Sequence, residues 1–288
     1  LIQNKDKRRK NTMKKMYLAV LAAFLGVILL GAKPASAIKI EKLSNVPNQG
    51  DFAVGSGKME LSLNAGSSST KDITVTNRMG KDTKFKVEVE DFGPSNNKEE
   101  VVKFYGSDES SPYSLKNYIK PEVSEFTLKH GEQASLPVVV SVPSDAPAGD
   151  LYGAVLISNV PDEAESTSDK VDAQVGIESR VGVLFFVRVN GQVNESGMIK
   201  SFSSDKSFYS NGPIKMNYSV TNTGNVYLNP EGSVVITNMF GGKSGEVKVD
   251  PSFVLPKSTR SSDVSWTKKF MLGKYTATLD LGSNFEKK

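Results

Sequence analysis

Hydrophobic and polar residues alternate along most of this chain of 288 residues, which is the pattern of β-strands with one buried face. The clearest example is the segment 84–90, where Phe85, Val87 and Val89 are expected to point inward. The alternating polar residues Lys84, Lys86, Glu88 and Glu90 are expected to point outward. This period of two predicts a sheet with one face in water.

Two apolar runs between Leu136 and Ser158 are separated by Pro143, Pro147 and Gly149. Proline and glycine favour a turn, so we predict two neighbouring strands that form a hairpin at the centre of an antiparallel sandwich. A third run, at 181–189, is apolar on both faces, which predicts a central strand.

A boundary is predicted near Asn190-Gly191, beyond which a second alternating set begins. There, Trp266 is expected to pack in a core together with Val264 and Phe270. The pattern predicts an all-β fold of two tandem immunoglobulin-like antiparallel β-sandwich domains, at 38–190 and 191–288, after an N-terminal signal or anchor helix. About seven short strands are expected in the second domain, including 198–202, 214–220, 234–237, 247–249, 264–270 and 275–281.

The first 37 residues have the organisation of a secretory signal. Lysines 14 and 15 precede an apolar run at 16–30, and Ala35-Ser36-Ala37 provides a small-x-small cleavage site. We therefore predict cleavage after Ala37, with residues 1–12 as a basic cytoplasmic leader or upstream sequence. An uncleaved membrane anchor is the alternative, although a span needs about 20 apolar residues.

Charge and cysteine content exclude several classes of protein. Eight lysines and arginines against Asp6 give residues 1–37 a net charge of +7, so the overall +4 leaves about −3 for residues 38–288. Nucleic-acid binding is disfavoured, because it relies on a concentrated basic surface. The absence of cysteine excludes disulfides, thiolate metal sites and a cysteine nucleophile.

The segment 93–120 interrupts the alternation and is interpreted as a long insertion with one helical turn at 115–119. It carries Tyr105, Tyr113 and Tyr118, which are weak candidates for ligand contacts. The alternative is that these tyrosines attach the insertion to the sandwich. The segment 161–170 is predicted to be a solvated acidic loop, and 171–177 another strand.

Few residues suit catalysis. His130, the single histidine, lies between two predicted strands and is assigned to a turn. Paired carboxylates for glycoside hydrolysis could come from 99–100 or 162–163, but both pairs lie in predicted loops. We predict a protein that is not an enzyme and has no cofactor and no metal site, because phosphate-loop and nucleophile-elbow patterns are also absent.

Several segments resemble the WxL-interacting surface proteins of Gram-positive bacteria. In the first domain the resemblance lies in residues 114–119, 126–128, and the turn 142–149 that leads to Tyr152-Gly153. In the second domain it lies in 222–226, 230–232, 238–241, Leu255-Pro256 with Arg260, and 273–275.

This resemblance implies an extracytoplasmic protein of the bacterial cell surface or cell wall. It also implies that the first domain binds peptidoglycan or another surface glycan, that the second domain binds a protein, and that a membrane helix follows. The chain departs from the family in its last residues, 285–288, which show no apolar span.

Three functions are therefore compared. The first is an exported, non-catalytic binding or scaffold protein, associated with the membrane only through the signal segment or a missing C-terminal helix. The second is a pilus-type assembly chaperone that lends a strand to a subunit. The third is a carbohydrate-active enzyme.

Overall fold

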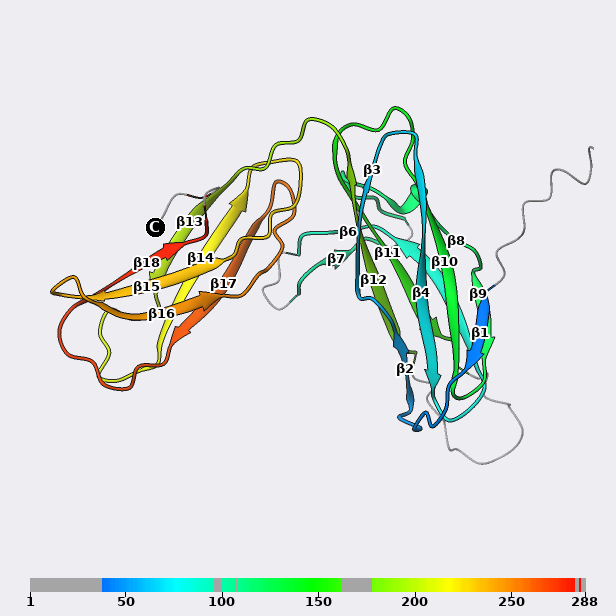
Figure 1. The fold of residues 1–288 in the computed structure, drawn as a ribbon, viewed down its shortest axis with the longest axis horizontal. Helices are drawn as coiled ribbons and strands as arrows, with labels where there is room; N and C mark the ends of the chain where they lie inside the picture. Colours follow the sequence, from blue (N-terminus) through cyan, green and yellow to red (C-terminus); the bar gives the residue numbers. More distant parts are fainter. Residues whose placement is uncertain (1–37, 96–99, 107, 162–177, 283–284, 286–288) are drawn as a thin grey trace, which may run out of the picture. The chain divides into compact units, whose positions relative to one another are not determined.

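A computed structural model describes residues 38–95, 100–106, 108–161, 178–282 and 285, and its named elements are β-strands apart from one short 3₁₀ turn. The strands form two sets (Figure 1). We call β1 to β12 the first sandwich and β13 to β18 the second sandwich, since no described sheet contains strands of both. The all-β prediction is confirmed. The predicted signal and the segments 162–163 and 171–177 lie outside the described residues.

The first sandwich has two sheets, named here after their central strands. The β10 sheet contains β1 (Lys39–Lys42), β10 (Glu132–Ser141), β4 (Ser68–Arg78), β2 (Asp51–Val54) and β8 (Ile119–Pro121). The β11 sheet contains β3 (Lys58–Leu63), β12 (Arg180–Val189), β11 (Gly149–Asn159), β5 (Thr83–Glu90) and β9 (Glu125–Leu128). Strand β3 runs parallel to β12, and the other pairs are antiparallel.

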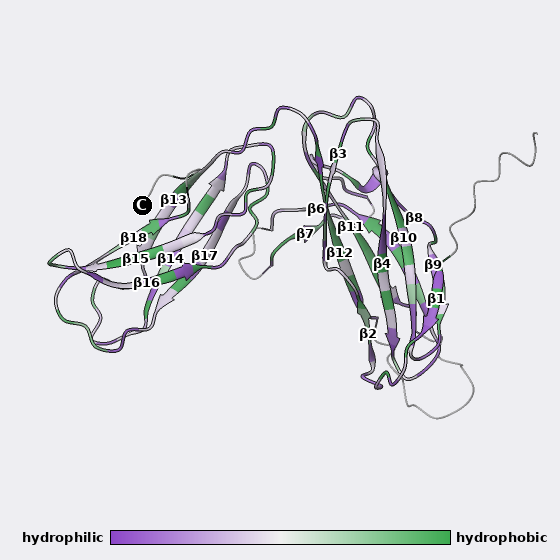
Figure 2. Ribbon diagram, in the orientation of Figure 1, coloured by the Kyte–Doolittle hydropathy of each residue, from purple (hydrophilic) through white to green (hydrophobic). Residues whose placement is uncertain are grey.

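The core of the first sandwich contains residues of both sheets, and Figure 2 shows hydrophobic positions along the strands of each. Alternate residues of β5 point into it, including the fully buried Phe85, as predicted. Glu90, expected to face water, is instead buried, because the insertion and Arg180 cover the end of β5. The central position predicted for 181–189 is confirmed by β12, which lies between β3 and β11.

The predicted hairpin at 136–158 is wrong in its pairing. Both strands form, but β10 and β11 belong to different sheets. The inward side chains of both, such as Val138 and Val155, enter the same core from opposite sides. The turn with Pro143 and Pro147 therefore crosses from one sheet to the other.

The second sandwich packs two three-stranded sheets around Trp266, Val234 and Leu279. Six strands are present among its described residues, where about seven were expected. Trp266 is buried as predicted, whereas Phe270 is exposed, because β17 ends at Trp266 and a loop follows. The sheets are β13 (Gly197–Ser204), β14 (Ile214–Asn222) and β17 (Thr259–Trp266), and β16 (Lys243–Val249), β15 (Gly232–Asn238) and β18 (Tyr275–Asp280).

Both sandwiches hold a fully buried asparagine at an equivalent turn. Asn77 near the end of β4 donates its amide to the carbonyl oxygens of Lys81 and Leu128, each at 2.8 Å. Asn222 at the end of β14 donates to the carbonyl oxygens of residues 226 and 254, also at 2.8 Å. In each case the side-chain oxygen accepts a hydrogen bond from the backbone two residues later. The two turns therefore satisfy their buried carbonyl groups in the same way.

Candidate functional site

The outer face of the β11 sheet is apolar at its centre, and the chain covers it with its own residues. Phe186 of β12 and Tyr152 of β11 contact each other with ring centroids 5.4 Å apart. Phe92, in the short strand β6 (Phe92–Gly93), lies 5.3 Å from Phe186 and is fully buried. The insertion returns through β7 (Lys103–Phe104), which pairs with β6, and through η1 (Lys116–Tyr118). This cover explains why 181–189 is apolar on both faces.

Asp91 attaches the insertion to the sheet. This fully buried carboxylate accepts hydrogen bonds from the backbone N–H groups of Ser111, Leu115 and Lys116 at 2.9–3.0 Å. Three fixed donors at one carboxylate hold the returning part of the insertion, 111–116, to the end of β5. The insertion is therefore an ordered part of the first sandwich in its described residues.

The three candidate tyrosines do not converge on one ligand. Tyr113 packs edge-on against Tyr152, with ring centroids 6.0 Å apart. Tyr118 packs against the core of the first sandwich. Tyr105 lies over Gly93, and the ammonium group of Lys103 is 5.3 Å from its ring centroid. All three are half-buried, as expected of side chains that attach the insertion.

Asp150 lies where the two sandwiches meet, and its side chain is 1% exposed. It accepts hydrogen bonds from Nε of Arg188 at 2.9 Å and from the backbone N–H of Tyr227 at 2.7 Å. Its hydrogen bond raises the pKa of Arg188. Burial, together with the negative charge of Asp150, raises the pKa of Tyr152. Arg188 therefore stays charged and Tyr152 stays neutral.

Lys58 occupies an aromatic cage at the same junction. Its ammonium group lies 4.6 Å from the ring centroid of Phe186, 4.9 Å from Tyr227 and 5.7 Å from Phe253. Glu60 closes the cage, 2.5 Å from the Lys58 ammonium and 2.6 Å from the Tyr227 hydroxyl. Cages of this kind recognise ligand cations in other proteins. Here the chain's own lysine fills it, so its role is to join the two sandwiches.

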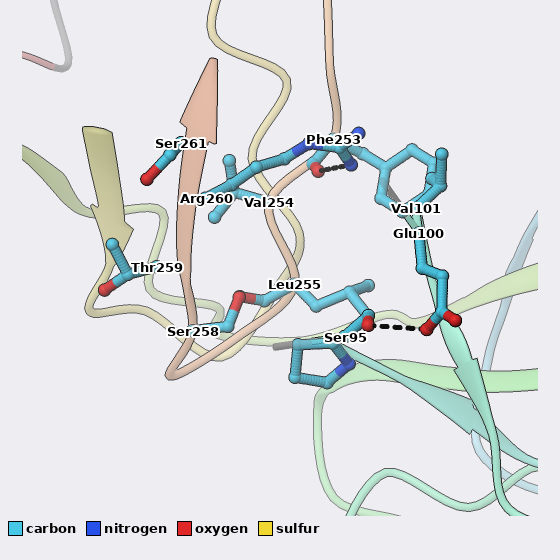
Figure 3. A pocket seen from close by; sticks show the side chains of 11 residues that line it. Ser95, Glu100, Val101, Phe253, Val254, Leu255, Ser258, Thr259, Arg260 and Ser261 are labelled. Atoms are coloured by element: carbon cyan, nitrogen blue, oxygen red, sulfur yellow. Dashed lines mark hydrogen bonds between the residues drawn. The ribbon is translucent and has the colours of Figure 1, made fainter. Parts of the chain in front are cut away.

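A pocket of about 190 Å³ opens beside this junction (Figure 3). The insertion contributes Ser95 and Glu100, which are joined by a hydrogen bond of 2.9 Å. The segment before and within β17 contributes Arg260, whose guanidinium donates to the Phe253 carbonyl oxygen at 3.0 Å and lies over the Phe253 ring. The other lining residues are Pro94, Val101, Val254, Leu255, Ser258, Thr259 and Ser261. A carboxylate, a guanidinium and several hydroxyls therefore line one cavity together with apolar side chains such as Leu255, which suits a polar organic ligand.

The residues that were weighed for catalysis are not brought together in the part of the chain that the structure describes. The His130 ring accepts a hydrogen bond from the Gly80 N–H at 3.2 Å and lies 3.1 Å from the Val46 carbonyl oxygen, so it joins three loops as a turn residue. Glu100 lines the pocket, but its neighbour at 99 lies outside the described part of the chain, as do 162–163. No cluster of metal-ligating side chains occurs in the part that the structure describes. Among those residues no helix has the length and apolarity of a membrane span.

No family model and no curated protein sequence match this chain. Its structure is similar to that of the class 5 fimbriae chaperone CfaA, with 11% identity, a TM-score of 0.42, and coverage of 81% of this chain and 100% of that one. The E. coli chaperone DraB is 14% identical with a TM-score of 0.40, and the match covers 82% of this chain and 94% of that one. A chain of the CsuC–CsuE chaperone and tip-adhesion subunit complex of Acinetobacter baumannii is 13% identical with a TM-score of 0.42. The match covers 79% of this chain and 92% of that one. At these identities and TM-scores, the similarity does not indicate a shared function.

Sequence reasoning did not find the pocket, because its lining comes from two segments about 150 residues apart. Arg260 was noted only as part of a family resemblance. The one available signal was the interruption of alternation at 93–120, which located the insertion but not its neighbours.

Proposed function

We propose that this chain is an exported, non-catalytic binding protein of the bacterial cell surface. In this proposal peptidoglycan or another surface glycan binds at the pocket that Glu100, in the insertion of the first sandwich, forms with Arg260 and its neighbours in the second sandwich. The second sandwich takes part in binding a protein partner. The predicted signal and the resemblance to WxL-interacting proteins are the reasons to assign the molecule to the cell surface.

The pocket is the observation that carries this proposal. Hydroxyl groups, a carboxylate and a guanidinium match the hydroxyls, amides and charged stem peptides of peptidoglycan. The rest of the apolar outer face is occupied by the chain itself. The histidine and the buried acids Asp91 and Asp150 are held in structural hydrogen bonds, which favours binding over catalysis.

Co-sedimentation of residues 38–288 with insoluble peptidoglycan, at two salt concentrations, tests the proposal. We expect binding, and about tenfold weaker binding for Glu100→Ala, because a hydrogen bond to a charged group contributes about 1.5–3 kcal/mol. Glu41→Ala, an exposed acid on β1, is the matched control and should bind normally. Failure of the parent protein to sediment, or equal binding by Glu100→Ala, would exclude this site.

A strand-lending assembly chaperone is the second candidate. Its support is a partly open edge, since β3 pairs with β12 only from Leu184 to Val189 and leaves residues 180–183 without a strand on that side in the described structure. Such an edge could accept an extended segment of a subunit. Hydrogen exchange would then slow at 180–183 in a stoichiometric complex with that subunit. Unchanged exchange would contradict this function.

A further inference from the structure

Five large apolar side chains are exposed at one end of the second sandwich. Phe208, Met239, Phe240, Phe270 and Leu272 are between 62% and 92% exposed. They belong to the loops 205–213, 239–242 and 267–274, which we call the loop end. Soluble monomers rarely expose such groups together without an interaction to make.

The three loops are neighbours in space (Figure 1). Asn238 and Tyr275 are register partners, so the β15–β16 loop and the β17–β18 loop begin side by side. A Cβ added at Gly273 would lie 2.8 Å from the Met239 sulfur. The Gly212 N–H donates to the Lys269 carbonyl oxygen at 3.4 Å, which connects the β13–β14 loop to the same end. The apolar side chains therefore lie on adjacent loops at the same end of the second sandwich.

The loop end is also basic. The three loops contain Lys206, Lys268, Lys269 and Lys274 against one acid, Asp205, which accepts a hydrogen bond from Tyr209. This gives a net charge of +3, although residues 38–288 carry about −3. Positive charge is thus concentrated where apolar side chains are most exposed.

We propose that the loop end binds the surface of a bilayer that contains anionic lipids. The Phe, Met and Leu side chains enter the interfacial region, and the lysines contact the anionic headgroups, the division of roles found in interfacial membrane binders. Exposed side chains on three separate loops suit a deformable bilayer. This proposal rests on the export assigned above but does not depend on the glycan pocket.

The way these loops are built supports the assignment. Met271, between Phe270 and Leu272, packs against the core of the second sandwich and anchors their loop. The Lys268 ammonium lies 5.4 Å from the Trp266 ring centroid and 5.5 Å from that of Tyr275. The loop is therefore held to the sandwich at its base while its neighbouring apolar residues remain outside. The side chains of Phe270 and Leu272 do not belong to the core, so their truncation should leave the fold intact.

Vesicle co-sedimentation of residues 38–288 tests the proposal. This unit contains every described strand and both cores, and omits the apolar run at 16–30, which would itself enter a bilayer. Vesicles of mixed phosphatidylglycerol and phosphatidylcholine are compared with phosphatidylcholine alone. We expect binding to the anionic vesicles, weakened by salt because it is partly electrostatic.

Two variants separate the apolar and basic contributions. The triple variant Phe240→Ser, Phe270→Ser and Leu272→Ser should bind at least about tenfold more weakly. The double variant Lys269→Gln and Lys274→Gln should lose about 25-fold, since about 1 kcal/mol for each lysine near an anionic surface corresponds to about fivefold. Matched controls are Met198→Ser, exposed on β13, and Lys71→Gln, exposed on β4, which should bind as the parent does.

Three results would overturn the proposal: no binding to anionic vesicles, equal binding to neutral vesicles, or full binding by both loop variants. Capture of a soluble protein at the loop end, without vesicle binding, would assign the surface to a protein partner instead. The loop variants should retain peptidoglycan binding. Failure here is therefore distinct from failure of the proposed glycan site.

Discussion

The two sandwiches share a buried turn but differ in what covers their apolar side chains. In the first sandwich, the insertion and segments of the second sandwich bury the outer face around Phe186. In the second sandwich, the apolar residues of the loop end remain uncovered. The same residue type therefore has two roles in this chain. A buried phenylalanine stabilises the fold, whereas an exposed phenylalanine is available to bind.

The largest expected effect is a difference in stability between variants of two phenylalanines. Phe186→Ala should lower the free energy of unfolding by about 3–5 kcal/mol, because it removes a ring packed among four others. Phe240→Ala should change it by less than about 0.5 kcal/mol, since that side chain is 87% exposed. Urea unfolding of both variants measures the two values. Similar losses would show that the loop end is part of the stabilising core.

The two buried asparagines should behave alike. Asn77→Ala and Asn222→Ala each remove two donated bonds and one accepted bond within a turn. Each should cost about 2–3 kcal/mol, because buried carbonyl groups are left without a donor. Thermal or urea unfolding provides the comparison. A clear loss at one position and none at the other would show that the turns are not equivalent.

Strand positions could be predicted from the sequence because burial of one sheet face imposes alternation. The pairing of the strands could not be predicted, because the same inward pattern suits either a hairpin or a crossing between sheets, as at 136–158. The buried asparagines were also missed, although the Val-Thr-Asn at 75–77 recurs at 220–222 and was a usable signal.

The burial of an acidic residue is the second feature that the sequence did not predict. Glu90 has the alternation of an outward residue, and only the position of Arg180 and the insertion explains its burial. The pocket likewise depends on contacts between Glu100 and segments near Arg260 that no local pattern contains. Hydrophobic periodicity is a local pattern, so it could not predict features that are formed by segments distant in the sequence.

Two Asp–Arg pairs provide the next comparison. Arg78 binds Asp51 through two nitrogens at 2.9 and 2.8 Å, and Asp51 is 49% exposed. In the pair of Asp150 with Arg188, Asp150 is buried and Arg188 is partly exposed. Asp150→Asn should cost about 2 kcal/mol, because it weakens a buried pair and its bond to the Tyr227 N–H. Asp51→Asn should cost less than about 1 kcal/mol. Equal values in urea unfolding would mean that burial does not strengthen the junction.

The smallest expected effect is the pH dependence of the lysine cage. Hydrogen bonds from Lys58 and Tyr227 hold the pKa of Glu60 below its ordinary value of 4.5. A carboxyl group whose pKa is lower in the folded state stabilises the fold above its unfolded pKa, and this stabilisation is lost as pH falls through the folded value. Because Glu60 is about half exposed, its contribution should be well under about 1 kcal/mol.

Urea midpoints of the parent and of Glu60→Gln should therefore differ slightly at pH 7 and converge as pH falls through the folded-state pKa of Glu60, which lies below 4.5. Glu246→Gln is the matched control, because Glu246 also has a lowered pKa, through Lys243 and Ser233, but lies far from the cage. The protection factor of the Tyr227 amide, which removes the intrinsic pH dependence of exchange, should change with pH in the parent and not in Glu60→Gln, since Glu60 accepts the hydrogen bond from the Tyr227 hydroxyl. A response that persists in Glu60→Gln would place the titrating group elsewhere and leave the cage without a pH-dependent part in joining the two sandwiches.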